Sequence, residues 1–518
     1  MTDYLLGVDA GNTMVKAAIF DAEGRTIASA ARNSDSQQPA PHFVERSPQD
    51  LWTAAERAIA DCIAMSGVDP SAIRAIGAAG HGNGLYLLDR NGKGLCGIQS
   101  MDSRAAPLAA QLDDTVGARI LQIAHSRPWP AMTPVLLAWM QAHRPESLAD
   151  AGHALLCKDV IVHGLTGRVG SDVSDLAGCG LLALPALRYE TELLDLYGIS
   201  GLSRLLPKPA HSHDIVGSVT PQAAAATGLR VGTPVVAGLF DVLASALGAG
   251  TARPGEASIV AGSWSINQVF ATELPRYPRA LLASVLGADI WVSCEASPTS
   301  AANLEWFVQQ ILVPEAAALG RDPFEMCNEL AAKAAQTPDA PVFHPFLYAG
   351  PVAGARGGFN GLGSWHSRAD LVRAVFEGIA FNHLAHFEKL DVAQGYDAIT
   401  LSGGAAKSRL WSQIFADTFQ KPVAISDCEE TGARGAAMAA AVGAALFPDY
   451  AEAATRMAAH QTLLQPDPAA ATRLQRRYRR WCGYRDALVE AWRAPPDLQA
   501  APEQDLQTNT QAERIHHG

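Results

Sequence analysis

The chain has 518 residues, with 40 Lys and Arg against 52 Asp and Glu, and a formal net charge of −12. At roughly 100–200 residues per domain, this length predicts two large domains or three ordinary ones. The negative charge disfavours nucleic acid and anionic membrane surfaces as general partners. No apolar run reaches the roughly 20 residues that a membrane span requires. We see no secretory signal, and eight scattered cysteines without a Cys-x-x-Cys pair suit buried free thiols in a cytoplasmic protein.

The first half of the chain opens with strand patterns around a turn of small and polar residues. Apolar runs predict a β-meander over residues 4–8, 14–20 and 26–30. After it, the patterns predict a helix over 47–65, strands over 73–79 and 85–88, a flexible glycine loop at 80–84, a buried strand over 235–240 and a helix over 244–249.

The second half repeats the hairpin pattern, with strands over 257–261 and 266–270 around a small polar turn. This echo predicts two related domains with a boundary near residue 250. Farther along, we expect helices over 370–390, 407–419, 431–446 and 474–492, and strands over 398–401 and 422–425. From residue 494 onward, few large apolar residues remain, which predicts a disordered tail.

Turns of small and polar residues are candidates for binding phosphate. In the turn Gly11-Asn12-Thr13, backbone N–H groups could approach a phosphate closely. Asp9 would repel a bare phosphate, but it becomes useful if Mg²⁺ lies between them. A plain hairpin turn with a hydrogen-bonded Asp9 is the alternative interpretation. Gly262-Ser263 and Gly403-Gly404 are similar turns, which could hold the rest of a nucleotide or simply connect two elements.

Asp241 follows a fully apolar strand and precedes an Ala-rich helix. That position should lie at the carboxyl end of a buried sheet strand, where α/β proteins place ligands. A carboxylate there can accept the proton of an alcohol that attacks a phosphoryl group. A helix N-cap is equally consistent with Asp at this junction, so both interpretations stay open.

Two further groups of polar residues call for an interpretation. His81, Asn83, Asp102 and Arg104 offer the directional hydrogen bonds that a polyol needs. The arginines of segment 473–480, mixed with aromatic residues, could suit nucleic acid. Given the net charge, we expect a helix that is solvated on one face and packs its aromatic side chains inward.

Taken in order, these motifs resemble the FGGY carbohydrate kinase family of the actin-like ATPase superfamily. The most specific match is segment 357–362, followed after seven residues by segment 370–377, which is similar to the family's C-terminal signature. Gly238-Leu239-Phe240-Asp241 resembles the family's G-x-x-D motif. The resemblance implies an α/β fold of two ribonuclease H-like domains around a cleft. Residues 1–250 would form the sugar-binding domain, 251–493 the ATP-binding domain, and 494–518 the tail.

The same resemblance implies that the γ-phosphate of MgATP is transferred to a terminal hydroxyl of a sugar. Asp241 would be the catalytic base, and Asp9 would hold Mg²⁺ through water. The implied phosphate- and nucleotide-binding residues are Gly11, Asn12, Thr13, Gly262, Ser263, Gly403 and Gly404. The implied sugar-selecting residues are His81, Asn83, Asp102, Arg104, Trp264 and Glu295.

Segments 295–300 and 303–307 are similar to L-xylulose kinases, so the expected substrate is an L-xylulose-like pentulose. His81, Asn83 and Val242 depart from the residues that many family members carry at these positions, which disfavours glycerol and D-xylulose. A kinase of erythritol or another short polyol stays open, as does an actin-like ATPase without sugar kinase activity. The expected partners are the sugar and MgATP, and a homodimer is left open.

Overall fold

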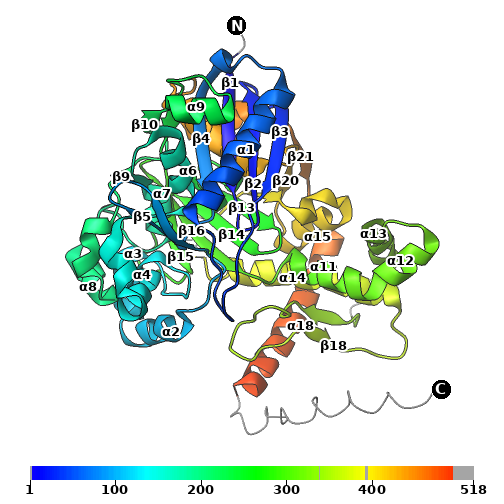
Figure 1. Cartoon of the computed structure of the whole chain (residues 1–518). Helices are drawn as coiled ribbons and strands as arrows, with labels where there is room; N and C mark the ends of the chain where they lie inside the picture. Colours follow the sequence, from blue (N-terminus) through cyan, green and yellow to red (C-terminus); the bar gives the residue numbers. More distant parts are fainter. Residues whose placement is uncertain (1–2, 336, 338, 391–394, 494–518) are drawn as a thin grey trace, which may run out of the picture.

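The computed structural model describes residues 3–335, 337, 339–390 and 395–493, so the predicted tail lies outside the described residues. Two large sheets form the centre of the molecule, and helices cover them (Figure 1). All eight cysteines are free thiols; five are buried as expected, whereas Cys96, Cys428 and Cys482 are half-buried. None of the helices in the described part of the chain combines the length and apolar composition of a membrane span.

The first sheet is built from the first half of the chain. Its strand order is β10-β11-β4-β1-β2-β3, with β12 pairing on β4. Strand β1 runs antiparallel to β2 and parallel to β4. The bounds are β1 Tyr4–Ala10, β2 Met14–Asp21, β3 Thr26–Asn33, β4 Ile73–Gly80, β10 Ile215–Ser218, β11 Pro234–Val236 and β12 Leu239–Phe240.

The second sheet repeats this topology in the second half of the chain. Its order is β15-β16-β14-β13-β19-β20-β21, in which β13 pairs antiparallel with β14 and parallel with β19. The predicted echo of the first hairpin is therefore confirmed. The bounds are β13 Glu256–Ala261, β14 Ser265–Ala271, β15 Leu282–Leu286, β16 Ile290–Ser297, β19 Ala398–Ser402, β20 Val423–Ser426 and β21 Gln461–Leu464.

Helices and three small sheets complete the fold. The first-half helices are α1 Pro48–Ser66, α2 Ala106–Thr115, α3 Gly117–Ala124, α4 Thr133–His143, α5 Pro145–Asp150, α6 Cys157–Thr166, α7 Val173–Gly178, α8 Thr191–Tyr197, α9 Pro221–Thr227 and α10 Asp241–Ala249. The second-half helices are α11 Ala301–Phe307, α12 Val313–Leu319, α13 Pro323–Lys333, α14 Arg368–Phe387, α15 Arg409–Phe419, α16 Thr431–Gly443, α17 Tyr450–Met457 and α18 Pro468–Trp492. The small sheets pair β5 Leu85–Asp89 with β6 Gly94–Ile98 and β7 Ala151–Leu155, β8 Ser171–Asp172 with β9 Pro209–Ala210, and β17 Val342–His344 with β18 Gly358–Asn360.

Helices α10 and α16 lie between the two sheets, where one apolar cluster joins them to both sheets. Because side chains alternate along a strand, Leu5, Gly7 and Asp9 of β1 face α16, while the residues between them face α1. A Cβ atom at Gly7 would lie 1.8 Å from the carbonyl oxygen of Ala433. This close approach needs glycine, and it seats α16 of the second half directly on the first sheet.

Three sequence predictions need correction. The strand predicted over 235–240 is two short strands, because Gly238 has a φ of +92° and turns the chain between them. The following helix begins at Asp241 rather than at residue 244. The loop predicted to be flexible at 80–84 is tightly packed, with His81 and Asn83 both buried. Helix α18, in contrast, packs Tyr478 and Trp481 inward as expected.

Candidate active site

The catalytic candidates meet where three parallel strands end. Ala10 of β1 and Phe240 of β12 both pair with Gly80 of β4, so the three strands end at the same level. The residues that follow β1, β12 and β4 are Gly11, Asp241 and His81. The carboxyl edge of the first sheet therefore brings together residues that are far apart in the sequence.

Asp241 lies at this edge as the first residue of α10. Its half-buried carboxylate accepts hydrogen bonds from the N–H groups of Val242 and Gly82. Burial and the nearby charge of Asp9 raise the pKa of Asp241 to about 8, although the two N–H groups oppose the shift. Phe240, not Asp241, occupies the cap position, so the N-cap interpretation is wrong. The arrangement gives a carboxylate whose pKa suits a general base near neutral pH.

Asp9 extends from the same sheet edge toward α16. A Cβ atom at Gly432, in the first turn of α16, would lie 2.2 Å from an Asp9 carboxylate oxygen, so the two residues are in contact. Burial raises the pKa of Asp9 to about 6, with Lys16 lowering it and Glu430 raising it. Lys16 and Glu430 form an ion pair of 2.9 Å across the two halves of the chain. A pair of carboxylates that repel each other, offering only oxygen donors, fits Mg²⁺.

The first turn has the shape expected of a hairpin, with further contacts to a neighbouring loop. The N–H of Gly11 donates to the carbonyl of Met14 at 2.9 Å. The Asn12 side chain binds the Ser100 hydroxyl at 3.0 Å, and Thr13 is exposed. Because the turn is closed by its own hydrogen bond, its remaining N–H groups are available to a ligand.

The second sheet presents a matching edge. Val260 of β13 pairs with Ser402 of the parallel strand β19, so the turns that follow these strands are neighbours. Gly403 has a φ of +83°, and a Cβ atom there would lie 2.8 Å from the carbonyl carbon of Ala261. These turns line a cavity of about 750 Å³, together with side chains from the second half and one from the first. The lining includes Gly262, Ser263, Gly403, Gly404, Lys16, Leu304, Phe324, Phe376 and Trp411.

This cavity is of a size that proteins use for nucleotide-sized ligands. It joins glycine turns, which let phosphates approach the backbone, to apolar side chains that suit a flat ring. The four predicted glycine and serine residues of the second half therefore lie together at one cavity.

His81 and Asn83 form the buried wall beside Asp241. The Nε2 atom of His81 lies 3.1 Å from the Tyr86 hydroxyl. Burial, with the charge of Arg46, lowers the pKa of His81 to about 3, so the ring is neutral. The carboxamide oxygen of Asn83 is buried and, among the described residues, has no hydrogen-bond partner. A buried polar atom without a partner is costly, which favours a ligand as its partner.

Asp102 and Arg104 are buried as a pair. Asp102 accepts hydrogen bonds from Arg104 at 2.8 Å and from the N–H of Val44 at 2.7 Å. Arg104 also pairs with Glu45 at 2.8 Å and lies 4.0 Å from the centre of the Phe43 ring. Both Asp102 carboxylate oxygens therefore accept hydrogen bonds within the protein. One Arg104 nitrogen, Nη1, is buried without a hydrogen-bond partner among the described residues.

Two residues that no sequence motif indicates also carry a buried polar atom without a hydrogen-bond partner among the described residues. The Gln99 carboxamide oxygen and the Trp129 indole nitrogen are buried and unpartnered within the described structure. Their loops adjoin the glycine loop, since the Gly84 N–H donates to the Ala131 carbonyl at 2.8 Å. A Cβ atom at Gly84 would also lie 3.4 Å from the backbone of Gln99. No sequence motif points to either residue, because only folding brings their loops beside the glycine loop.

Trp264 and Glu295 occupy different places. Trp264 is half-buried in the turn between β13 and β14. Glu295 lines a separate cavity of about 460 Å³ and lies 3.4 Å from Lys389. Its neighbour Cys294 belongs to the apolar cluster between the sheets, so Glu295 points to the opposite face of β16. The structure does not bring Glu295 beside Asp241.

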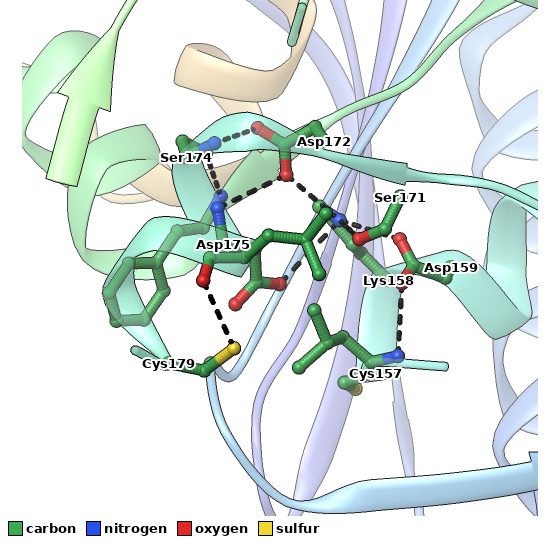
Figure 2. Close-up of polar contacts among 12 residues, drawn as sticks. Cys157, Lys158, Asp159, Ser171, Asp172, Ser174, Asp175 and Cys179 are labelled. Atoms are coloured by element: carbon green, nitrogen blue, oxygen red, sulfur yellow. Dashed lines mark hydrogen bonds and ion pairs between the residues drawn. The ribbon is translucent and has the colours of Figure 1, made fainter. Parts of the chain in front are cut away.

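Lys158 and three carboxylates, those of Asp159, Asp172 and Asp175, form a buried charged cluster (Figure 2). The Lys158 ammonium lies 2.6 Å from Asp159, 3.0 Å from Asp172 and 3.5 Å from Asp175. Burial opposes the charge of Lys158, but the three carboxylates raise its pKa. Burial also raises the pKa of Asp175, whose two oxygens accept no hydrogen bond from the described residues.

The cluster is connected to the catalytic strand through α7. The Phe240 N–H donates to the Ser174 hydroxyl at 3.1 Å, and Asp172 accepts from the Ser174 N–H at 2.8 Å. Ser284 of β15 donates to the Ser174 carbonyl at 2.6 Å. Helix α7 therefore joins the residue before Asp241 to both the charged cluster and the second sheet.

Comparisons with known proteins agree with this geometry. Residues 4–248 match the model of the N-terminal domain of the FGGY family of carbohydrate kinases, and residues 257–444 match its C-terminal domain. The chain is 33% identical to the L-xylulose/3-keto-L-gulonate kinase of Escherichia coli, covering 93% of this chain and 96% of that protein. It is 32% identical to a probable L-xylulose kinase of Pasteurella multocida, covering 92% and 98% of the two chains.

A solved structure supports the fold. The xylulose kinase of Rhodospirillum rubrum superposes with a TM-score of 0.85 at 26% identity, covering 94% of this chain and 99% of that chain. This likeness confirms the predicted fold class, α/β with two domains of the actin-like ATPase type.

Proposed function

Because the chain belongs to the FGGY family of carbohydrate kinases, we propose that it transfers the γ-phosphate of MgATP to a terminal hydroxyl of an L-xylulose-like pentulose. Membership in this family makes the chain a sugar kinase. Relatives named L-xylulose kinases support the choice of sugar. The segments 295–300 and 303–307 are among the stretches that resemble the same subgroup.

The observation that carries the proposal is the position of Asp241. It stands where three parallel strands end, next to Asp9 and to the buried polar wall of the glycine loop. The raised pKa of Asp241, about 8, makes its ionised carboxylate a stronger base than an ordinary Asp, which favours transfer of the hydroxyl proton to it.

In the proposed reaction, the terminal sugar hydroxyl lies within hydrogen-bond reach of Asp241. The carboxylate accepts the hydroxyl proton as the oxygen attacks the γ-phosphate in line, and the bond between the γ-phosphorus and the bridging oxygen breaks, so that ADP leaves. The N–H groups of Gly82 and Val242 hold the carboxylate in place. The Mg²⁺ that accompanies ATP would be held through Asp9 and would offset charge on the phosphates. Backbone N–H groups of the turns at Gly11 and Gly262 bind phosphate oxygens.

Unpartnered buried atoms support a sugar as the second substrate. Asn83 and Gln99 each present an acceptor oxygen, while Arg104 and Trp129 each present a donor nitrogen. A polyol hydroxyl both donates and accepts, so this mixture of donors and acceptors suits a chain of hydroxyl groups. We therefore add Gln99 and Trp129 to the proposed sugar-binding residues, and we assign Asp102 the role of holding Arg104.

A coupled assay of ADP release over pentuloses, pentitols, tetritols and glycerol tests the proposal. We expect the highest kcat/KM with L-xylulose. A preference for erythritol or another short polyol would replace the proposed substrate while keeping the enzyme class. ADP release at one rate with and without any sugar would contradict the proposed transfer.

A further inference from the structure

One buried arginine differs from the others in the described chain. Five arginines are almost fully buried, and four of them pair with a carboxylate: Arg104 with Asp102 at 2.8 Å, Arg373 and Arg477 with Glu377 at 2.8 and 2.6 Å, and Arg434 with Asp427 at 3.0 Å. Arg46 is 1% exposed, yet no carboxylate of the described residues pairs with it. A guanidinium stays charged in proteins, so Arg46 is a buried cation without a counter-ion.

All the groups that Arg46 contacts are neutral. Its Nη1 donates to the carbonyls of Gly11 at 3.0 Å and Asn12 at 3.2 Å. Its Nη2 donates to the Tyr86 hydroxyl at 2.9 Å and to the Cys157 sulfur at 3.4 Å. The Nε group has no partner among the described residues. Arg46 thus joins the first phosphate turn to the strand that follows the glycine loop.

These contacts hold the direction of two peptide groups, and the Gln99 carboxamide also donates to the Asn12 carbonyl at 2.7 Å. A trans peptide is planar, so its N–H points opposite to its C=O. When Arg46 binds the carbonyls of Gly11 and Asn12, the N–H groups of Asn12 and Thr13 point away from Arg46. Neither N–H donates to another group of the described residues. Two adjacent free N–H groups on one side of a turn, with a cation behind them, form a site that favours an anion.

Burial of a charge without a counter-ion costs several kcal/mol, which a purely structural role does not require. A neutral donor could tie the same two carbonyls to Tyr86 at lower cost. The charge is useful only if a negative group binds close by, and the proposed triphosphate is such a group. The contacts to the two turn carbonyls, at 3.0 and 3.2 Å, place the guanidinium on the carbonyl side of the turn, opposite the N–H groups of Asn12 and Thr13.

We infer that Arg46 is a positioning residue for phosphoryl transfer, which aims the N–H groups of Asn12 and Thr13 at the phosphates and is neutralised by them. This inference rests on the proposed binding of ATP phosphates at the first turn. It predicts that the charge of Arg46 is needed for nucleotide affinity and turnover, beyond any contribution to folding.

The test compares Arg46→Met and Arg46→Lys with the control Arg477→Lys, a buried arginine that contacts Glu377 and two carbonyls of the second half. ADP binding is measured by calorimetry and by the ADP-dependent shift of the melting temperature, without sugar. We expect Arg46→Met to weaken ADP binding about tenfold and to lower kcat about a hundredfold. Arg46→Lys, which keeps the charge, should recover at least about tenfold of that kcat.

The control separates a structural role from a positioning role. Arg477→Lys should lower the melting temperature but leave ADP affinity and the kcat of the folded enzyme unchanged. Wild-type ADP affinity and kcat in folded Arg46→Met would overturn the inference. If Arg46→Met does not fold, Arg46→Gln, which keeps a hydrogen-bond donor but not the charge, decides: reduced ADP affinity and kcat support the inference, and wild-type values overturn it. Absence of sugar-dependent ADP release by the wild type would instead contradict the proposed function.

Discussion

The raised pKa of Asp241 predicts how the ligand-free protein responds to pH. The shift runs from 3.8 to about 8, so folding holds a proton on Asp241 that the unfolded chain has already released. The folded state therefore loses stability as pH rises from about 4 to about 8. A shift of four units converts to about 5–6 kcal/mol. Because Asp241 is half-buried and open to the solvent of the site, we discount this to about 2 kcal/mol.

Asp241→Asn removes the titrating group and keeps the size of the side chain. At pH 4.5 the variant and the wild type should melt at nearly the same temperature. At pH 8.5 the variant should melt about 4–8 °C higher, which corresponds to about 2 kcal/mol in a domain of this size. Melting curves of both ligand-free proteins between these pH values measure the difference. A difference that stays constant over the whole range would refute the raised pKa.

Three further predictions concern the nucleotide cavity, the proposed sugar site and the buried charged cluster. Gly403→Ala should raise the KM for ATP at least about tenfold, because its Cβ atom would lie 2.8 Å from the backbone of Ala261. Gly404→Ala should raise this KM less, because no atom lies nearer than 3.6 Å to its Cβ atom. Equal effects of the two variants would argue against the steric reason. Trp129→Phe removes the unpartnered indole N–H, together with part of the ring, and should raise the KM for the sugar about tenfold without changing that for ATP, as initial-rate kinetics would show. Lys158→Met should lower the free energy of unfolding by about 3–5 kcal/mol, because it leaves three buried carboxylates without their cation. Asp175→Asn should lower it by less than about 1.5 kcal/mol, because the Asp175 oxygens accept no hydrogen bond from the described residues. Chemical unfolding that ranked the two variants in reverse would contradict these roles.

Much of the fold could be predicted from local patterns. The apolar runs at 4–8, 14–20 and 26–30 correspond to β1, β2 and β3, and the repeated hairpin corresponds to β13 and β14. The helix starts were less predictable. Helix α10 begins at Asp241, after the chain turns at Gly238. Hydrophobic periodicity does not reveal a positive φ at a single glycine, so this turn could not be predicted from the sequence pattern.

Candidate site residues could be predicted where a motif marks the end of a strand. Residues on loops that come together only in the folded protein could not be predicted. Asp9, His81 and Asp241 each follow or end an apolar run, so their strands bring them to one edge. Gln99 and Trp129 lie in loops without any pattern, and only their unpartnered atoms identify them. Glu295 was assigned from similarity of its segment, which does not state the face of β16 on which a side chain lies.

The central claim is that Asp241 accepts the proton of the sugar hydroxyl. It is tested most directly by sugar-dependent ADP release of the wild type and of Asp241→Asn, with sugar and ADP binding measured on the same samples. The wild type should release ADP only when a suitable sugar, with L-xylulose the best, is present. The variant should bind both ligands and turn over about 10²–10⁴ times more slowly. Near-normal turnover by Asp241→Asn would contradict the claim.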